Sequence, residues 1–407
     1  MTVTLADIES AAALLEGRIV KTPLVPAVGL DEWGIDLHLK LENLQRTGSF
    51  KARGAYVRMS RLPADAMRQG VIAMSAGNHA QGVAYAAQQL GIPATIVMPE
   101  QTPFTKVERT RRYGARVILK GETLSESAAF AEQVAAAEAL TFVHPYNDAD
   151  VIAGQGTIGL EMLAALPALD VLVIPIGGGG LIGGIATAAK ALKPGIEIIG
   201  VEAALYPSMQ ESLRGSPPSS GGQTLAEGIA VKIPGALNRE IAARLVDDII
   251  LVDESAIERA VQILIESQKL VAEGAGAAGI AAIMSRPERF SGRTVGTVIC
   301  GGNIDSRLLS SVLLRGLARD GKLVRIRCEI SDSPGVLAKV AGLIGQCGGN
   351  IVEIYHQRLF YNVPVKLAEL DAVIETRSAE HMREIIAALN AAGITARLLG
   401  GATPEGW

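Results

Sequence analysis

The sequence contains few cysteines, few aromatic residues and no long apolar run without charges. Only three of its 407 residues are cysteines, Cys300, Cys328 and Cys347, too few and too widely spaced for a disulfide framework or a paired-cysteine metal site. No uncharged apolar stretch reaches the roughly 20 residues that a membrane-spanning helix needs. Residues 1–9 lack the positive segment and apolar core of a secretory signal. We therefore expect a soluble protein of the reducing cytoplasm.

Neither sign of charge dominates the chain. Its 38 basic and 42 acidic residues are interspersed and give a formal net charge of −4. This balance offers no basic stripe for a nucleic acid or an anionic membrane surface, so neither is expected as a partner. Hydrophobic residues make up 49% of the sequence and aromatic residues only 4%, which indicates large aliphatic cores in two or three domains. Small molecules are the expected partners.

Short β-branched runs alternate with alanine-rich segments in which apolar residues recur at helical spacing. The runs that indicate strands are residues 71–74, 94–98, 115–119, 171–176, 196–202 and 294–299. A near-continuous apolar run such as residues 171–174 indicates a strand that helices cover on both faces. The pattern therefore predicts an α/β fold with parallel sheets wrapped by helices.

The pattern changes near residues 316–322, where a helix-like run ends and an alternating strand begins. The order beyond this point is strand 323–330, helix 336–347, strands 350–355 and 365–375, helix 379–391 and strand 395–399. This βαββαβ order is typical of a ferredoxin-like unit. We therefore expect a first domain at 1–318 and a second at 322–402.

Five motifs carry residue types suited to chemistry. In chain order they are SFKARGA at 49–55, SAGNHAQG at 75–82, PIGGGGL at 175–181, EGAGA at 273–277 and CGGN at 300–303. Lys51 lies at a predicted helix start. A lysine there can be a Schiff-base nucleophile, although most lysines of a protein are solvated surface residues. The glycine run follows an apolar strand and opens a helix, a context in which backbone N–H groups cradle a phosphate. A dinucleotide site or a bare tight turn also fits glycines there, but would leave the Lys51 and Cys300 motifs unexplained.

Taken together and in this order, the five motifs resemble the pyridoxal-phosphate (PLP) threonine/serine ammonia-lyases of the tryptophan-synthase-β-like fold (fold type II). The resemblance covers residues 1–320 and implies two open α/β subdomains, the smaller one, at about 45–145, being inserted in the larger. The turn at residues 332–335, with residues 348–351, is similar to ACT regulatory domains, which pair side by side and bind amino acids between subunits. The resemblance thus also implies a homodimer or homotetramer.

The resemblance implies a role for each motif around a PLP cofactor. Lys51 would bind the cofactor covalently and, once substrate displaces it, remove the Cα proton, while Phe50 fixes the direction of the lysine. Cys300 would face the pyridine nitrogen as a neutral thiol, which favours elimination over transamination. The phosphate would bind at Gly177, Gly178, Gly179, Gly180 and Leu181. The substrate carboxylate would bind at Ser75, Ala76, Gly77, Asn78 and His79, and the Asn78 side chain would also bond the 3′-oxygen of the cofactor.

The implied reaction is β-elimination of water from threonine or serine, which gives 2-oxobutanoate or pyruvate and ammonia. A dehydratase of another 3-hydroxy amino acid remains an alternative, as does a non-catalytic amino-acid sensor in which the second domain is the working part. Serine racemase is a third alternative, but racemases carry a proton-donating serine at the position of Ala76. Alanine cannot donate a proton, so we expect elimination without racemisation.

Two further expectations concern sites outside the five motifs. Some relatives bind a divalent metal through acidic residues after the strand at 196–202; Glu202 is present here, but Tyr206 and Ser208 occupy the other two positions, so we expect no metal. An amino-acid effector, such as isoleucine or valine, is expected near Pro334, Gly335 and Asn350, at an interface between the second domains of two subunits. Such a site would regulate the affinity for substrate.

Overall fold

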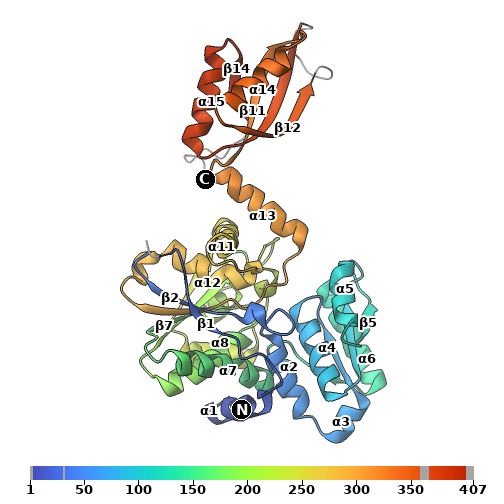
Figure 1. The fold of residues 1–407 in the computed structure, drawn as a ribbon. Helices are drawn as coiled ribbons and strands as arrows, with labels where there is room; N and C mark the ends of the chain where they lie inside the picture. Colours follow the sequence, from blue (N-terminus) through green and yellow to red (C-terminus); the bar gives the residue numbers. More distant parts are fainter. Residues whose placement is uncertain (1–2, 31–32, 358–365, 400–407) are drawn as a thin grey trace. The chain divides into compact units, whose positions relative to one another are not determined.

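The computed structural model describes residues 3–30, 33–357 and 366–399, and the chain divides into two compact units, 1–304 and 305–407 (Figure 1). Within the described ranges, no helix combines the length and the apolar character that crossing a membrane requires. Each unit is built on its own sheets, and the first unit contains all five motifs.

The larger sheet of the first unit has six strands in the order β1-β2-β10-β7-β8-β9. They are β1 (Leu24–Pro26), β2 (Asp36–Lys40), β10 (Thr294–Val298), β7 (Val171–Pro175), β8 (Glu197–Ala203) and β9 (Asp248–Val252). Only the edge strand β1 runs antiparallel to its neighbour; the other pairs are parallel. Every residue of β7 is buried, as its continuous apolar sequence predicts.

Helices cover both faces of this sheet. They are α1 (Leu5–Leu15), α7 (Ala149–Ala165), α8 (Gly180–Leu192), α9 (Ser208–Arg214), α10 (Ala236–Leu245), α11 (Glu254–Glu266) and α12 (Gly274–Ser285). Figure 1 shows α7 and α8 on one side and α11 and α12 on the other. Within the described residues, short 3₁₀ helices also occur at η2 (Glu42–Leu44), η3 (Glu227–Ile229) and η4 (Pro287–Arg289). This two-sided cover is what the alternation of strands and helices in the sequence predicts.

The smaller sheet has four parallel strands in the order β5-β4-β3-β6. They are β5 (Arg116–Leu119), β4 (Ala94–Met98), β3 (Val71–Met74) and β6 (Thr141–Phe142), and the helices around them are α2 (Lys51–Ser60), α3 (Ala64–Gln69), α4 (Asn78–Leu90), α5 (Phe104–Arg111) and α6 (Leu124–Glu138). Alternate residues of β3 face different cores: Val71 and Ala73 pack on the side of α2 and α4, whereas Ile72 packs with α6. All four strands fall within the predicted subdomain 45–145.

Three helices of the first unit touch backbone to backbone. Helix α2 crosses α7 so closely that a Cβ added at Gly154 would lie 2.7 Å from the Cα of Gly54. Helix α7 crosses α8 in the same way, because a Cβ at Gly156 would lie 2.9 Å from the carbonyl oxygen of Gly184. Real Cβ atoms do not approach so closely, so glycine is required at these crossings. The crossings set the position of α2, whose first residue is Lys51.

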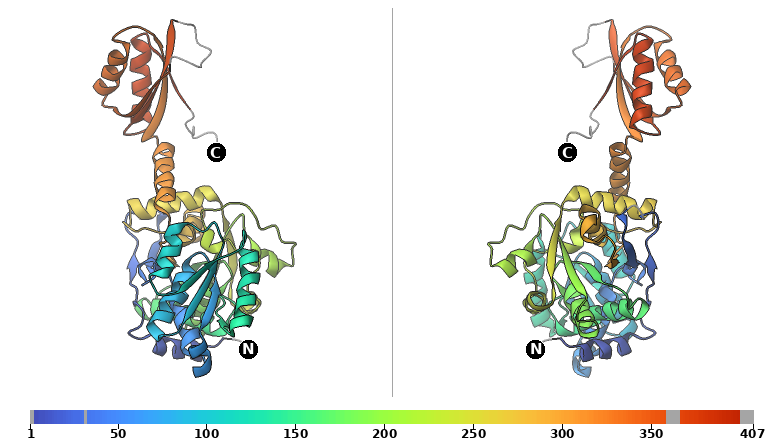
Figure 2. Two further views of the ribbon diagram at one scale, coloured as in Figure 1. Left: turned by 90° about the vertical axis from the view of Figure 1, so that its right-hand side faces the viewer. Right: turned by 90° about the vertical axis from the view of Figure 1, so that its left-hand side faces the viewer.

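The second unit begins with α13 (Ser306–Arg319) and continues as an antiparallel sheet with two helices. Its elements are β11 (Leu323–Ser331), α14 (Val336–Gln346), β12 (Asn350–Gln357), β13 (Leu367–Glu375), α15 (Ala379–Ala391) and β14 (Thr395–Leu398), with strand order β12-β13-β11-β14. Both views in Figure 2 show α14 and α15 on one side of this sheet. The apolar core between them is continuous and includes Ile326, Leu370 and Ile385.

The predicted fold class is confirmed: two open α/β sheets form the first unit, and a βαββαβ unit follows. The division of the chain differs in detail, because α13 groups with the second unit, whereas the sequence-based boundary assigned residues up to 318 to the first domain. The expected strand start at Val365 and domain end at residue 402 lie outside the described residues.

Candidate active site

The five motifs meet where strands of both sheets end. The backbone N–H of Phe50 donates to the carbonyl oxygen of Cys300 (3.2 Å), and Ser49 forms a β-bridge with Gly301, so the lysine motif is bound to the fifth motif. The Asn78 side chain of the second motif bonds Glu273 of the fourth. In open α/β sheets this carboxyl-end edge is where ligands bind.

Lys51 is the first residue of α2 and is half-buried. Its Nζ donates a hydrogen bond to the carbonyl oxygen of Pro145 (2.9 Å) and lies 5.2 Å from the ring centre of Phe50. Burial lowers the pKa of this amine to about 8, although the charges of Cys300 and Glu273 act in the opposite direction. A substantial share of the amine is therefore neutral near physiological pH, as a nucleophile or base requires.

The glycine run joins β7 to α8. Gly179 has a φ of +92° and caps α8, a conformation that favours glycine. Among the described residues, the backbone N–H groups of Gly177, Gly178 and Gly179 donate to no protein acceptor. Unpaired donors at a helix start form an anion site, so this loop suits a phosphate. Leu181 follows in the first turn of α8 and is buried.

Two side chains from outside the motifs hold this loop in place. A Cβ at Gly178 would overlap the ring of Tyr146, so the tyrosine lies directly against the loop backbone. Asn238, fully buried, donates from Nδ2 to the carbonyl oxygens of both Gly178 (2.8 Å) and Tyr146 (2.9 Å). The loop is thus braced by α10 and by the segment that also accepts the Lys51 hydrogen bond.

The second motif lies between β3 and α4. Ser75 follows the strand, Ala76 and Gly77 form the turn, and Asn78 and His79 begin the helix, whose first N–H groups have no intrahelical acceptor. The ring of His79 hydrogen-bonds the carbonyl oxygen of Val143 (2.8 Å). Burial and the nearby Lys51 lower the pKa of His79 to about 3, so the imidazole is neutral and structural.

Cys300 follows β10 and is 4% exposed. Burial, with the Glu273 carboxyl nearby, raises the pKa of its thiol well above the ordinary value. The thiol is therefore neutral, consistent with a partner that does not protonate a pyridine nitrogen.

Several residues that support the site were not predicted from the sequence. Beneath the lysine, the guanidinium of Arg53 is fully buried and forms a fork to Glu42 (2.9 and 2.7 Å), with a further ion pair to Glu161 (2.6 Å). Lys40 also pairs with Glu161 (2.5 Å). The only sequence signal for this network is the SFKARGA motif, because Arg53 belongs to it and lies two residues beyond the lysine on α2.

The carboxylate of Glu202 supports the start of α9. Its carboxylate oxygens accept hydrogen bonds from the backbone N–H groups of Met209 (2.7 Å) and Gln210 (3.0 Å) at the start of α9. Burial raises the pKa of Glu202 to about 7. Within the described ranges, no group of three or more His, Cys, Asp or Glu side chains is arranged to hold a metal ion.

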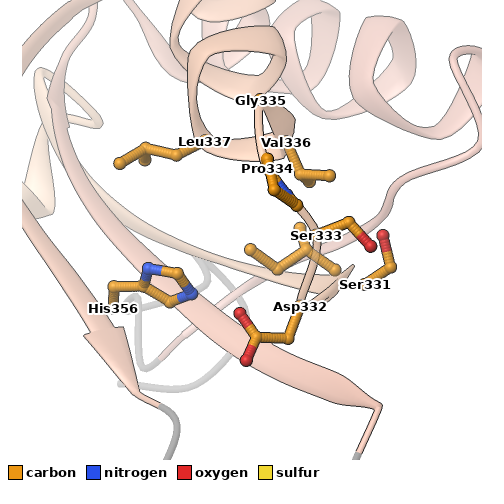
Figure 3. Close-up of a pocket in the computed structure, with 9 residues that line it drawn as sticks. Ser331, Asp332, Ser333, Pro334, Gly335, Val336, Leu337 and His356 are labelled. Carbon is orange, nitrogen blue, oxygen red and sulfur yellow. The ribbon is translucent and has the colours of Figure 1, made fainter.

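The second unit contains a cavity of about 220 Å³ at the start of α14. Pro334 and Gly335 line it, as does His356, whose enclosed Nε2 has no hydrogen-bond partner among the described residues. Figure 3 shows His356, from β12, and Asp332, from the loop before α14, on facing walls. Asn350 is not among the lining residues; its side chain bonds Glu375 (2.8 Å).

The residues of the first unit fit PLP by their chemistry. A lysine with a partly neutral amine, a loop of unpaired backbone N–H groups and a neutral thiol meet at one edge. These are the groups that a covalently held phosphorylated pyridine requires.

Comparison with known proteins supports this assignment. Residues 15–301 match the family described as pyridoxal-phosphate dependent enzyme. The L-threonine ammonia-lyase of Thermotoga maritima is 43% identical over 401 residues, which cover 98% of this chain and all of the relative. Among solved structures, processed threonine deaminase isoform 2 from Solanum lycopersicum is 36% identical (TM-score 0.72; 76% of this chain, 86% of that chain).

The solved structure of maize serine racemase is similar to the same degree. It is 33% identical, with a TM-score of 0.73, and the match covers 78% of this chain and 98% of that chain. The shared fold therefore does not separate elimination from racemisation. On the family match and these identities, the chain belongs to the pyridoxal-phosphate dependent enzymes, and PLP is its cofactor.

Proposed function

We propose that this enzyme is a threonine ammonia-lyase that converts L-threonine to 2-oxobutanoate and ammonia. The observation that carries the proposal is the half-buried Lys51 amine, with its lowered pKa, at the point where all five motifs meet. The names of the relatives, L-threonine ammonia-lyase and threonine deaminase, support threonine as the substrate. Serine is a second expected substrate because it carries the same 3-hydroxyl group.

PLP, when bound, withdraws electrons from the substrate Cα and makes its proton acidic. The protein would supply the base, because the neutral Nζ of Lys51 can take the Cα proton. The N–H groups of Gly177 to Gly180 would hold the phosphate, and the start of α4 would bind the substrate carboxylate. The neutral thiol of Cys300 would be the partner of the pyridine nitrogen, which favours loss of the hydroxyl over transamination.

Ala76 favours elimination over racemisation. A racemase needs a proton donor on the face of Cα opposite the lysine, and the family resemblance implies a serine at this position in racemases. The methyl group of Ala76 has no proton to give. We therefore expect ammonia release from L-serine without D-serine at a comparable rate.

The experiment compares wild-type protein with K51A and with K120A, a control in which an exposed lysine far along the chain is removed. Release of 2-oxobutanoate from L-threonine should fall by at least about a thousandfold in K51A, because one group provides both attachment and base, and remain unchanged in K120A. Retained turnover in K51A would refute the proposal. Turnover of another 3-hydroxy amino acid without turnover of threonine would mean that this amino acid, and not threonine, is the substrate.

We further propose that an amino acid binds the cavity of the second unit and regulates the enzyme. We also propose that the enzyme is at least a dimer. The support is the cavity at the start of α14, an eleven-residue helix whose first N–H groups suit a carboxylate. Isoleucine and valine are the first effectors to test. We expect each effector to shift the KM for threonine and P334A to abolish this shift. Light scattering should show a dimer or a tetramer. Unchanged kinetics with both isoleucine and valine would count against these effectors.

A further inference from the structure

We propose that Glu273 is a positioning residue that, together with Asn303, holds the side-chain amide of Asn78 in the orientation that presents an N–H to the cofactor. Glu273 opens the fourth motif and is the N-cap residue of α12, but its carboxyl group does not cap the helix and has no role in the proposed reaction. The inference rests on the proposed function, in which the Asn78 amide bonds the 3′-oxygen of PLP.

The amide of Asn78 has a different partner on each side. Its Nδ2 donates to Oε1 of Glu273 (2.6 Å), and its Oδ1 accepts from Nδ2 of Asn303 (2.8 Å). A half-turn of the amide would set its oxygen against the carboxylate and its NH₂ against the NH₂ of Asn303. Both contacts would be repulsive, so only one orientation is satisfied. The second hydrogen on Nδ2 remains for the cofactor oxygen.

Both partners are themselves fixed. Nδ2 of Asn303 also donates to the carbonyl oxygen of Thr47 (2.8 Å), next to the lysine motif. The backbone N–H of Glu273 donates to the carbonyl oxygen of Gly301 (3.0 Å). A Cβ at Gly301 would overlap Oε1 of Glu273 and lie 3.1 Å from Nδ2 of Asn78, so the fifth motif carries glycine where the carboxyl and amide meet. Glu273 and Asn303 thus form a clamp around the Asn78 amide, and packing as well as hydrogen bonds holds this clamp in place.

The charge on Glu273 is sensitive to pH. Burial raises its pKa to about 7, while the Asn78 hydrogen bond acts in the opposite direction. The other charged groups that act on it are Lys106, Glu227 and Lys51, and the Cys300 thiol lies nearby. Lys106 and Glu227 form an ion pair with each other (2.9 Å), so their effects largely cancel. Protonation converts an acceptor into a possible donor, and the clamp weakens on the acid side of neutrality.

The test measures the affinity of the apoprotein for PLP by absorbance titration in wild type, E273A, N78A and the double variant. We expect E273A to weaken PLP binding about tenfold, because it removes a hydrogen bond to a charged acceptor. In the N78A background the same substitution should have no further effect, since Glu273 acts through Asn78. A full additional loss in the double variant would show that Glu273 acts independently and would overturn the inference.

Two further variants keep the test decisive if E273A does not fold. E273Q keeps an acceptor but cannot titrate, so its PLP affinity should stay within about threefold of wild type above pH 8 and exceed that of wild type below about pH 7, where both proteins share the titration of Lys51. E202Q removes the other buried carboxyl of similar pKa, which contacts neither Asn78 nor Asn303, and should follow the pH dependence of wild type. A ratio of E273Q to wild-type affinity that does not change with pH would also overturn the inference. Full PLP affinity in N78A would instead refute the Asn78 assignment within the proposed function.

Discussion

Nζ of Lys51 donates a hydrogen bond to the carbonyl oxygen of Pro145, 2.9 Å away, in the segment that follows β6. The next residue in that segment, Tyr146, packs against Gly178 of the glycine loop that joins β7 to α8. The same short stretch of chain therefore contacts the attachment point and the loop proposed to bind the opposite end of the cofactor. One short segment of the chain therefore sets the separation of these two groups.

The lowered pKa of Lys51 makes cofactor attachment depend on pH. Only the neutral amine attacks an aldehyde, so the attachment rate should rise about tenfold per pH unit and level off near pH 8, where the folded-state pKa lies. An unperturbed lysine would level off only near 10.5. Stopped-flow absorbance of PLP with apoprotein measures this, and a rate that still rises beyond about pH 10 would contradict it. Between about pH 8 and pH 10.5 the unfolded chain binds more protons than the folded protein, so the free energy of unfolding of the apoprotein should rise with pH. The K51M variant should lack this contribution.

A methyl group at Gly178 should disrupt the glycine loop that we propose binds the phosphate. G178A would press into the ring of Tyr146 and is expected to lower the free energy of unfolding by about 1–3 kcal/mol and to weaken PLP binding. The control is G195A, in a turn where an added Cβ meets nothing within 4 Å. Adding Y146A to G178A should restore part of the stability but not the binding of phosphate. Equal stability of G178A and G195A in urea would exclude this packing.

Removal of Arg53 should be far more costly than removal of a surface arginine. R53A leaves Glu42 buried and unpaired, and we expect a loss of about 3–5 kcal/mol in denaturant unfolding. R68A breaks an exposed pair with Asp65 and should cost less than about 1 kcal/mol. R53K keeps the charge without the two-pronged geometry and should fall between them. Similar losses for R53A and R68A would mean that the network contributes little.

Chelation should leave the activity intact. Both carboxylate oxygens of Glu202 already accept backbone N–H groups, and Tyr206 and Ser208 supply no further charge. Dialysis against EDTA should therefore not change kcat/KM for threonine relative to dialysis without chelator. A loss that Mg²⁺ or Ca²⁺ restores would contradict this expectation.

The sequence predicts most strands of the first unit because their burial is encoded locally. Continuous apolar runs such as β7 leave no alternative to a strand covered on both faces. Strands β1, β2, β6 and β9 were not predicted. β1 has only three residues and β6 only two, and the buried Lys40 at the end of β2 forms an ion pair with Glu161, far along the chain. No local pattern contains that information.

The same distinction holds for the candidate site. Lys51 and the glycine run stand out because their residue types and flanking elements suffice to suggest a role. Glu273 stands in the fourth motif without a role, and Asn238 lies outside the motifs, because each matters through a partner distant in the chain: Asn78 for the first, Gly178 for the second. Identifying such supporting residues from sequence would require the contacts themselves.

The glycine crossings of α2, α7 and α8 restrict how the gene can change. Every amino-acid replacement reached from a glycine codon adds at least a Cβ, and at Gly54, Gly154, Gly156 and Gly184 that atom meets the backbone of the neighbouring helix or a buried side chain. A second mutation in the partner glycine offers no compensation, because glycine cannot become smaller. We therefore expect these four codons to admit only synonymous changes in a saturation library selected for threonine turnover, whereas the surrounding alanines exchange with serine.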